Sequence, residues 1–287
     1  MSLSVGQISY LNCAPFFHHL ARTGFQGELI KGVPSALNRM LHEGRIDVCP
    51  SSSFEYACHW QDYFLLPHFS ISSFGPVQSV LLFSPCAPDK LAGRDIALTG
   101  ESATSVNLLR VLLWEYFGVK GAHLAVPAQS SVEELIAQGR PALLIGDRAL
   151  RGARRFQNQC LIYDLGELWQ QFTGLPFVFA LWILRRDAAL RKGEEIAALN
   201  RLLEQSLSLA FASLEEMALT VPENAWLEPE NICAYWRCMS YRLEQPHIQG
   251  LELFFQLCHK HGLIETLPAM EFFTAQPKPA VQGTVFA

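Results

Sequence analysis

The sequence predicts an α/β fold in two lobes, on the basis of two observations. Strand-like apolar runs alternate with helix-like runs over the first third of the 287 residues, and the alternation restarts after a Pro-rich break at 84–88. A further apolar run, rich in β-forming residues, follows at 177–184. Alternating strands and helices indicate a mostly parallel sheet covered by helices. The break and the later apolar run therefore indicate a second α/β lobe inserted into the first.

The first lobe is expected to begin with three pairs of a strand and a helix. Pro34 suits the first turn of a helix and Gly44 suits its end, while Ser51, Ser52 and Ser53 can cap the helix that follows. In chain order, the predicted elements are a strand at 3–9, a helix at 14–22, a strand at 28–31, a helix at 35–42, a strand at 46–49 and a helix at 54–59.

The inserted lobe shows the same alternation. Ser130 and Ser131, followed by Glu133 and Glu134, provide a cap and first-turn acids for one of its helices. Its other predicted elements are strands at 95–99, 123–126 and 142–145 and a helix over about 104–117. Beyond 187 the apolar spacing is helical, with a further helix at 251–258. We therefore expect one lobe at 1–83 and 181–287, the other at 84–180, and hinge strands near 78–84 and 177–184.

Composition and charge exclude several classes of protein. The net charge of −5 and the lack of a basic stretch argue against a nucleic-acid partner. No uninterrupted apolar run reaches about 18 residues, so no membrane-spanning helix is expected, and the first residues do not resemble a secretory signal. The eight cysteines form no CxxC pair and fit no zinc spacing, which is typical of reduced thiols. We expect a cytoplasmic protein with a small-molecule substrate; the pattern predicts no oligomeric state.

Polar residues follow several predicted strands, at the edge of an α/β sheet where ligands bind. Asn12 lies in the turn after the first strand and has both a donor and an acceptor, although it could simply cap the next helix. Ser79 precedes the apolar run at 80–83 and could be an ordinary strand residue. Gly146 and Asp147 follow the strand at 142–145, where Asp147 could equally be a helix cap.

Hydroxyl residues also gather at two predicted helix starts, one in each lobe. These are Ser51–Ser53 and the pair Thr104 and Ser105. Free backbone N–H groups and the helix dipole at such a start favour an anion, but capping alone also explains both clusters. Motifs for dinucleotides, for nucleotide phosphates, for a zinc protease and for a serine hydrolase are absent. We therefore expect no cofactor and no metal site.

The chain resembles one family in several ordered segments. They are Ser-Tyr-Leu-Asn at 9–12, Pro-Ser-Ala-Leu-Asn at 34–38, Gly-Pro-Val-Gln-Ser-Val at 75–80, Ile-Gly-Asp at 145–147 and Thr-Gly-Leu-Pro-Phe-Val-Phe-Ala-Leu-Trp at 173–182. These segments resemble the chorismate dehydratases of the futalosine route to menaquinone. The resemblance implies a type II periplasmic-binding-protein-like fold with a ligand cleft between the lobes. It also implies a hydro-lyase that converts chorismate to 3-[(1-carboxyvinyl)oxy]benzoate.

The resemblance also implies roles for individual residues. Asn12 and Ser79 take the catalytic positions of the family's motifs. The substrate-binding positions fall on Tyr10, Ser52, Ser53, Thr104, Ser105, Gly146 and Asp147. Three other functions remain open: the related dihydroxynaphthoate synthase, a transport solute-binding protein and the ligand-sensing module of a regulator. The motifs favour the dehydratase over the synthase. The absence of a signal peptide argues against transport, and the absence of a preceding helix-turn-helix argues against a regulator.

Overall fold

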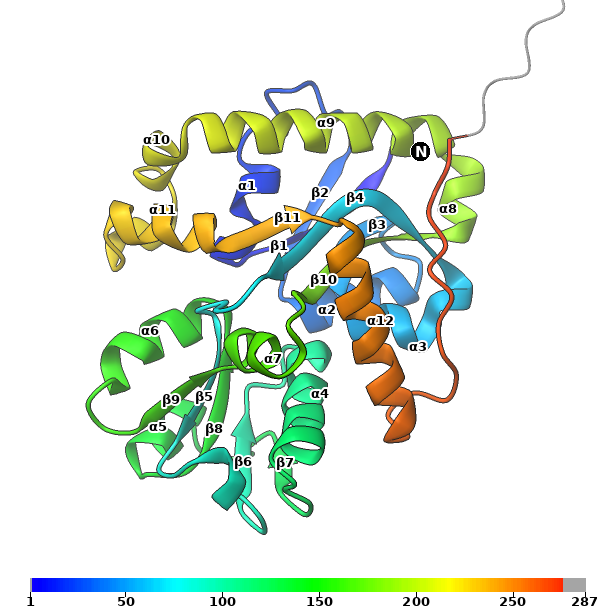
Figure 1. The fold of residues 1–287 in the computed structure, drawn as a ribbon. Helices are drawn as coiled ribbons and strands as arrows, with labels where there is room; N and C mark the ends of the chain where they lie inside the picture. The colour runs from blue at the N-terminus through cyan, green and yellow to red at the C-terminus, as the bar shows by residue number, and fades with distance from the viewer. Residues whose placement is uncertain (1, 276–287) are drawn as a thin grey trace, which may run out of the picture.

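Two mixed β-sheets, each covered by helices, form the two lobes of the computed structural model, which describes residues 2–275 (Figure 1). The larger sheet has six strands in the order β11 (Met239–Arg242), β4 (Tyr63–Ser73), β10 (Phe177–Arg185), β3 (Val48–Ser52), β1 (Ser4–Ile8) and β2 (Glu28–Gly32). The smaller has five in the order β7 (His123–Ala125), β6 (Asp95–Leu98), β8 (Ala142–Ile145), β5 (Val80–Ser84) and β9 (Leu161–Asp164).

Strand direction brings the polar segments to facing edges of the two sheets. β1 is parallel to both β2 and β3, so the turn after β1 and the end of β3 share one edge of the larger sheet. In the smaller sheet β6 and β8 are parallel, and β5 runs antiparallel to β8 with Val80 opposite Ile145. The start of β5 therefore lies beside the carboxyl end of β8.

Helices cover both sheets. In chain order they are α1 (Ala14–Phe17), α2 (Pro34–His42), α3 (Ser53–His59), α4 (Ala103–Val111), α5 (Val132–Ala137), α6 (Gly146–Phe156), α7 (Leu165–Thr173), α8 (Arg186–Arg191), α9 (Gly193–Ala212), α10 (Leu214–Ala218), α11 (Pro229–Cys238) and α12 (Gln245–Lys260). The long α9 crosses the first lobe, and α12 extends from that lobe toward α4 (Figure 1). No helix within residues 2–275 is both long and apolar enough to cross a bilayer.

The core of the first lobe fixes the short helix that follows the β1 turn. The ring of Phe16 in α1 packs edge-on against Trp182, Tyr241 and Phe69, with centroids 5.2, 5.3 and 5.7 Å away. The backbone carbonyl of Phe16 also accepts a hydrogen bond of 2.8 Å from Ser206 Oγ in α9. These contacts anchor α1 and so hold the preceding turn, with Asn12, against the sheet.

Most expected elements are present, with one shortened helix and three additional strands. The helix expected at 14–22 consists of a 3₁₀ turn, Leu11–Cys13, and the single turn α1, after which 18–24 form turns. β4, β9 and β11 were not anticipated. β9 pairs with β5 at one edge of the smaller sheet, whereas β4 and β11 pair with each other and place part of the C-terminal third in the larger sheet.

The chain crosses between the sheets twice. It passes from β4 to β5 through 74–79 and returns from α7 to β10 through 174–176. β5 belongs to the smaller sheet and β10 to the larger, so we propose that the lobe boundaries lie in these connections, a few residues before the predicted 83/84 and 180/181. The Asp164 carboxylate accepts hydrogen bonds of 3.0 and 2.6 Å from the backbone N–H groups of Val77 and Gln78. These bonds hold the first connection in place.

Candidate active site between the lobes

A small cavity of about 60 Å³ lies where the two lobes meet. Six of the nine predicted site residues line it: Tyr10, Asn12, Ser52, Ser79, Ser105 and Gly146. Ser53, Thr104 and Asp147 do not line it. Among residues 2–275, those that form its wall include no Asp, Glu, His, Lys, Arg or Cys side chain. The cavity is thus apolar, with hydroxyl and amide groups as its polar contacts.

Asn12 has an unsatisfied polar atom at this cavity. It lies in the 3₁₀ turn after β1, and its Oδ1 is buried without a hydrogen-bond partner in the described part of the chain. The capping alternative is wrong, because Tyr10 and Cys13 occupy the cap positions of the 3₁₀ turn and of α1. A buried carbonyl that lacks a donor costs about 1–3 kcal/mol. A ligand that donates to Oδ1 would recover that free energy.

Ser79 is held by a helix from the C-terminal third. Tyr235 Oη in α11 donates a hydrogen bond of 2.8 Å to Ser79 Oγ, and Ser79 is only 2% exposed. Burial raises the pKa of the Tyr235 phenol well above its usual value, so the phenol stays protonated and donates. The next residue, Trp236, donates from Nε1 to the Leu11 carbonyl at 2.8 Å. α11 therefore supports both proposed catalytic residues.

Sequence reasoning missed this support. The periodicity of the C-terminal third predicts helices but does not show which residue reaches the cleft. The one local sign of this support is the adjacent pair Tyr235 and Trp236. Such aromatic residues usually belong to the core, so the pair did not indicate a role at the cleft.

Thr104 joins the lobes, together with the start of α3. Thr104 Oγ1 lies 2.5 Å from Ser52 Oγ and 3.3 Å from Ser53 Oγ, and accepts from the Phe54 N–H at 3.1 Å. Ser53 Oγ also donates to the Val178 carbonyl at 2.9 Å. Ser53 and Thr104 thus contact each other across the junction, while Ser52 caps α3 and reaches the cavity.

The start of α4 faces the cavity from the other lobe. Ser102 is its N-cap and accepts from the Ser105 N–H at 3.2 Å, and the two hydroxyl oxygens are 3.0 Å apart. Both serines line the cavity, although Ser102 was not among the predicted site residues. Ser52 thus caps α3 as expected, whereas Ser102 rather than Thr104 or Ser105 caps α4, and the two helix starts lie on opposite lobes.

Tyr10 spans the junction beside Gly146. Tyr10 Oη donates to Glu101 Oε2 at 2.6 Å. Burial and this hydrogen bond raise the pKa of Tyr10 well above its usual value. Gly146 has a φ of +59°, and a Cβ built on it would lie 2.9 Å from Cδ2 and Cε2 of Tyr10. Glycine at 146 thus gives the tyrosine ring its room against the second lobe.

Asp147 makes a third contact between the lobes. Its Oδ1 accepts from the Leu11 N–H at 3.1 Å, whereas the cap position of α6 belongs to Ile145, so the capping alternative is wrong here too. Burial raises the pKa of Asp147 to about 6, with the Leu11 hydrogen bond opposing the shift. Asp147 positions the turn that carries Asn12 but does not line the cavity.

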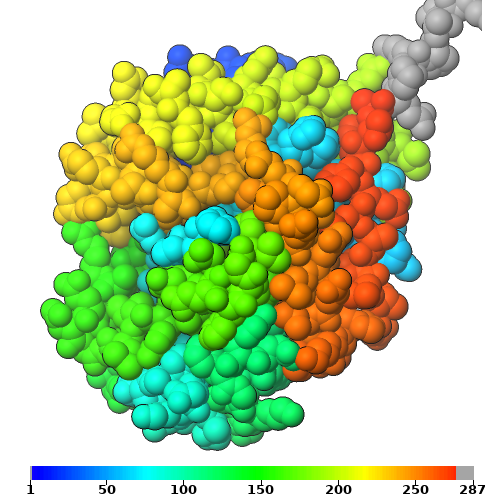
Figure 2. Space-filling view, viewed as in Figure 1, coloured from blue at the N-terminus to red at the C-terminus, as the bar shows by residue number. Residues whose placement is uncertain are grey.

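The three contacts through Glu101, Thr104 and Asp147 describe a closed form of the molecule. On the face in Figure 2 the inserted lobe packs directly against the first, with no wide groove between them. A cavity of about 60 Å³ is well below the roughly 300–1,000 Å³ of small-molecule sites. The cavity is therefore too small, in this form of the molecule, for a ligand of ordinary small-molecule size.

Comparison with known proteins identifies the family. A family profile described as menaquinone biosynthesis matches residues 3–260. A protein of Thermus thermophilus named chorismate dehydratase is 35% identical over 265 residues, which cover 87% of this chain and 93% of that protein. The chain belongs to this menaquinone-biosynthesis family. The profile spans both sheets and α11, so the family assignment includes every residue of the cavity.

Solved structures confirm the fold predicted for this family member. Protein AF1704 of Archaeoglobus fulgidus aligns with a TM-score of 0.74 at 18% identity, covering 91% of this chain and 98% of that one. The periplasmic aliphatic sulphonate-binding protein SsuA of Escherichia coli aligns with a TM-score of 0.67 at 14% identity, covering 98% and 97%. A Candida albicans protein described as having the generic periplasmic-binding-protein fold gives 0.70 at 10% identity, covering 98% and 100%. The two-lobed periplasmic-binding-protein-like fold is therefore confirmed.

Proposed function

We propose that this family member is a hydro-lyase that removes water from chorismate to give 3-[(1-carboxyvinyl)oxy]benzoate, a step of menaquinone biosynthesis. The observation that carries the proposal is the 35% identity to a chorismate dehydratase over 93% of that protein. The closed cavity at the lobe junction supports it, because Asn12 and Ser79, at the family's catalytic positions, both line that cavity.

The reaction needs a proton acceptor and a group that assists the departing oxygen. The C3–H bond and the C4–O bond break, a C3–C4 double bond forms, and the ring becomes aromatic. The hydroxide that leaves C4 and the proton from C3 together make one water. No carboxylate or imidazole lines the cavity within residues 2–275, so we assign the acceptor role to a carboxylate of the substrate itself.

Ser79 and Asn12 then act by hydrogen bonding. Ser79 Oγ accepts from Tyr235 and donates only a long hydrogen bond of 3.4 Å to the Val77 carbonyl. We propose that this hydrogen turns to the C4 oxygen as charge develops there. The Asn12 amide orients the substrate, and its orphan Oδ1 accepts from a substrate hydroxyl. Holding the C3 hydrogen close to the internal carboxylate favours the unimolecular transfer.

Chorismate is a dianion, and no cationic side chain among residues 2–275 lines the cavity, so other groups must compensate its negative charge. The N-terminus of α4 and the hydroxyls of Ser52, Ser102 and Ser105 offer dipoles and donors at the cavity wall. Closure through Tyr10 and Glu101 would exclude water and strengthen these interactions. We propose that the lobes open to admit chorismate and close before the elimination. A cytoplasmic location, where such biosynthesis would take place, is part of this proposal.

The direct test is conversion of chorismate by the purified full chain. We expect loss of one water by mass spectrometry and the appearance of an aromatic product, with no metal or cofactor added and with a chelator present. Asn12→Ala provides the matched inactive variant. If the wild-type protein binds chorismate but returns it unchanged, the enzymatic function is wrong and a binding function replaces it. If the chelator abolishes turnover, the metal-independent mechanism is wrong.

A further inference from the structure

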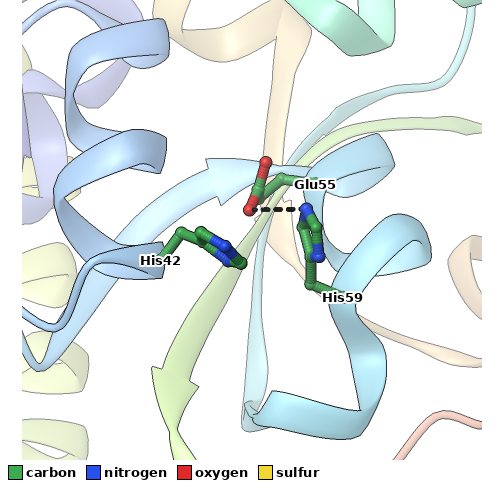
Figure 3. Close-up of side chains that lie close together, drawn as sticks. All are labelled: His42, Glu55 and His59. Carbon is green, nitrogen blue, oxygen red and sulfur yellow. Dashed lines mark ion pairs between the residues drawn. The ribbon is translucent and has the colours of Figure 1, made fainter.

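A second group of chemically reactive side chains lies outside the cavity. His42 is the last residue of α2, and Glu55 and His59 are one turn apart on α3, with their side chains converging (Figure 3). Each residue offers one atom that could bind a metal, an imidazole nitrogen or a carboxylate oxygen, and these three atoms all lie within 4.8 Å of one another. Glu55 Oε1 and His59 Nε2 are 3.8 Å apart, and the two imidazole rings are 4.4 Å apart between centroids.

We propose that His42, Glu55 and His59 bind one divalent transition-metal ion, with Zn²⁺ as the best match. Two imidazole nitrogens and one carboxylate oxygen form a ligand set that zinc uses with water in the fourth position. Bonds of about 2.0–2.2 Å would place the ligand atoms about 3.3–3.6 Å apart in a tetrahedral site. The ligand atoms now lie within 4.8 Å of one another and would have to approach by up to about 1.5 Å, and His42 is exposed enough to leave the fourth position open to water.

The electrostatics of Glu55 support a cation. Its side chain is 17% exposed, and in the described part of the chain no lysine or arginine forms an ion pair with it. Arg185, beside the end of α2, instead donates to the carbonyl of His42 at 2.9 Å and pairs with Asp187 at 2.8 Å. A partly buried carboxylate with only a histidine as ionic partner is stabilised by a divalent ion.

A supporting hydrogen bond also orients the carboxylate. Tyr63 Oη donates to Glu55 Oε1 at 3.1 Å, which leaves Oε2 and the second lone pair of Oε1 for a metal. Outer-shell donors of this kind hold ligands in place and raise metal affinity in known sites.

The position of the site indicates what the ion would do. Ser53, the first residue of α3, contacts Thr104 at the lobe junction, while His59 is the last residue of the same helix, at the end away from the junction. A bound ion would therefore tie the end of α2 to α3 without contacting the cavity. The expectation that the chain holds no metal rested on cysteine spacing and on a linear motif. It missed this group because the ligands come from two helices.

Calorimetric titration of the metal-free full chain with ZnCl₂ tests the site. We expect one Zn²⁺ per chain and a rise in melting temperature of about 2 °C or more at saturation. His42→Ala and Glu55→Gln should each weaken binding at least about tenfold and remove the thermal shift. Because His42 is exposed, His42→Ala should keep the fold of the wild type, which circular dichroism can verify.

Two control variants separate this site from other ligands. His123→Ala removes an exposed histidine of the inserted lobe, and Cys58→Ser removes the thiol beside His59. Both should bind Zn²⁺ as the wild type does. Three results would each overturn the proposal. The first is unchanged Zn²⁺ binding in His42→Ala and Glu55→Gln, the second is loss of binding in Cys58→Ser, and the third is no heat of binding in the wild type. Conversion of chorismate should be unchanged in His42→Ala, so this test and that of the proposed function can fail separately.

Discussion

Replacing Ser79 by alanine should lower stability and turnover for two separable reasons. A polar residue at a strand end would ordinarily cost only about 0.5 kcal/mol when replaced. Here Tyr235 Oη, fully buried, would lose its acceptor at 2.8 Å. An unpaired buried hydroxyl costs about 1–3 kcal/mol, equivalent to a fall in melting temperature of about 2 °C or more. Loss of the hydrogen bond to the departing oxygen should add about 3 kcal/mol to the barrier, a rate loss of at least about a hundredfold.

The double variant Ser79→Ala/Tyr235→Phe separates the two effects. Removing both partners of a hydrogen bond is nearly neutral, so the melting temperature should return close to that of the wild type. Turnover should stay low, because the group that touches the substrate is still missing. Tyr235→Phe alone should slow turnover less than Ser79→Ala, since Tyr235 does not line the cavity. The assays are single-turnover conversion of chorismate and thermal unfolding. Recovery of turnover together with stability in the double variant would refute a catalytic role for Ser79.

Four further predictions follow from the same contacts. Asn12→Ala should reduce turnover at least about a hundredfold with little change in melting temperature, because Oδ1 has no hydrogen-bond partner to lose among residues 2–275. A collapse of turnover and melting temperature together would contradict this. Gly146→Ala should slow turnover by forcing the Tyr10 ring away from a Cβ at 2.9 Å, and near-normal kinetics would show that the ring yields freely. Burial raises the pKa of Asp147 to about 6, so the contribution of Asp147 to the free energy of unfolding is present below about pH 4 and is lost as the pH rises through about 6. Asp147→Asn should flatten that part of the curve of stability against pH. An unchanged curve would disprove the assignment. Small-angle scattering should show compaction when product is added, and an unchanged radius of gyration at saturation would argue for a cleft that is already closed in the free protein.

The sequence predicts much of the fold because local signals and tertiary structure agree at several helix starts. Pro34, the serines before α3 and Ser131 before α5 occupy the helix starts that the sequence indicates. β4 was missed for a local reason. It contains Pro67, and His68 adopts a φ of +76°, so no regular alternation marks this strand of 11 residues. Its pairing with β10 shows register shifts, which are a tertiary property.

The candidate site divides in the same way. Asn12, Ser52, Ser79 and Ser105 could be found because each follows or precedes a recognisable strand or helix start. Tyr235 could not, because only the packing of α11 against the first sheet brings a residue 156 positions away to Ser79. Thr104 and Asp147 were expected to bind substrate, and that role stays a prediction. In the closed form their hydrogen bonds join one lobe to the other.

The order of the strands determines which lobe can fold first while the polypeptide is being synthesised. All strands of the smaller sheet come from the continuous stretch 80–164, so this lobe can fold as soon as that stretch is made. The larger sheet must wait, because its central strand β10 joins β3 to β4 only after Arg185 has been added. Until then β3 and β4 present open edges, which are templates for wrong pairing. The nascent chain is therefore most in need of protection by chaperones while its inserted lobe is already folded.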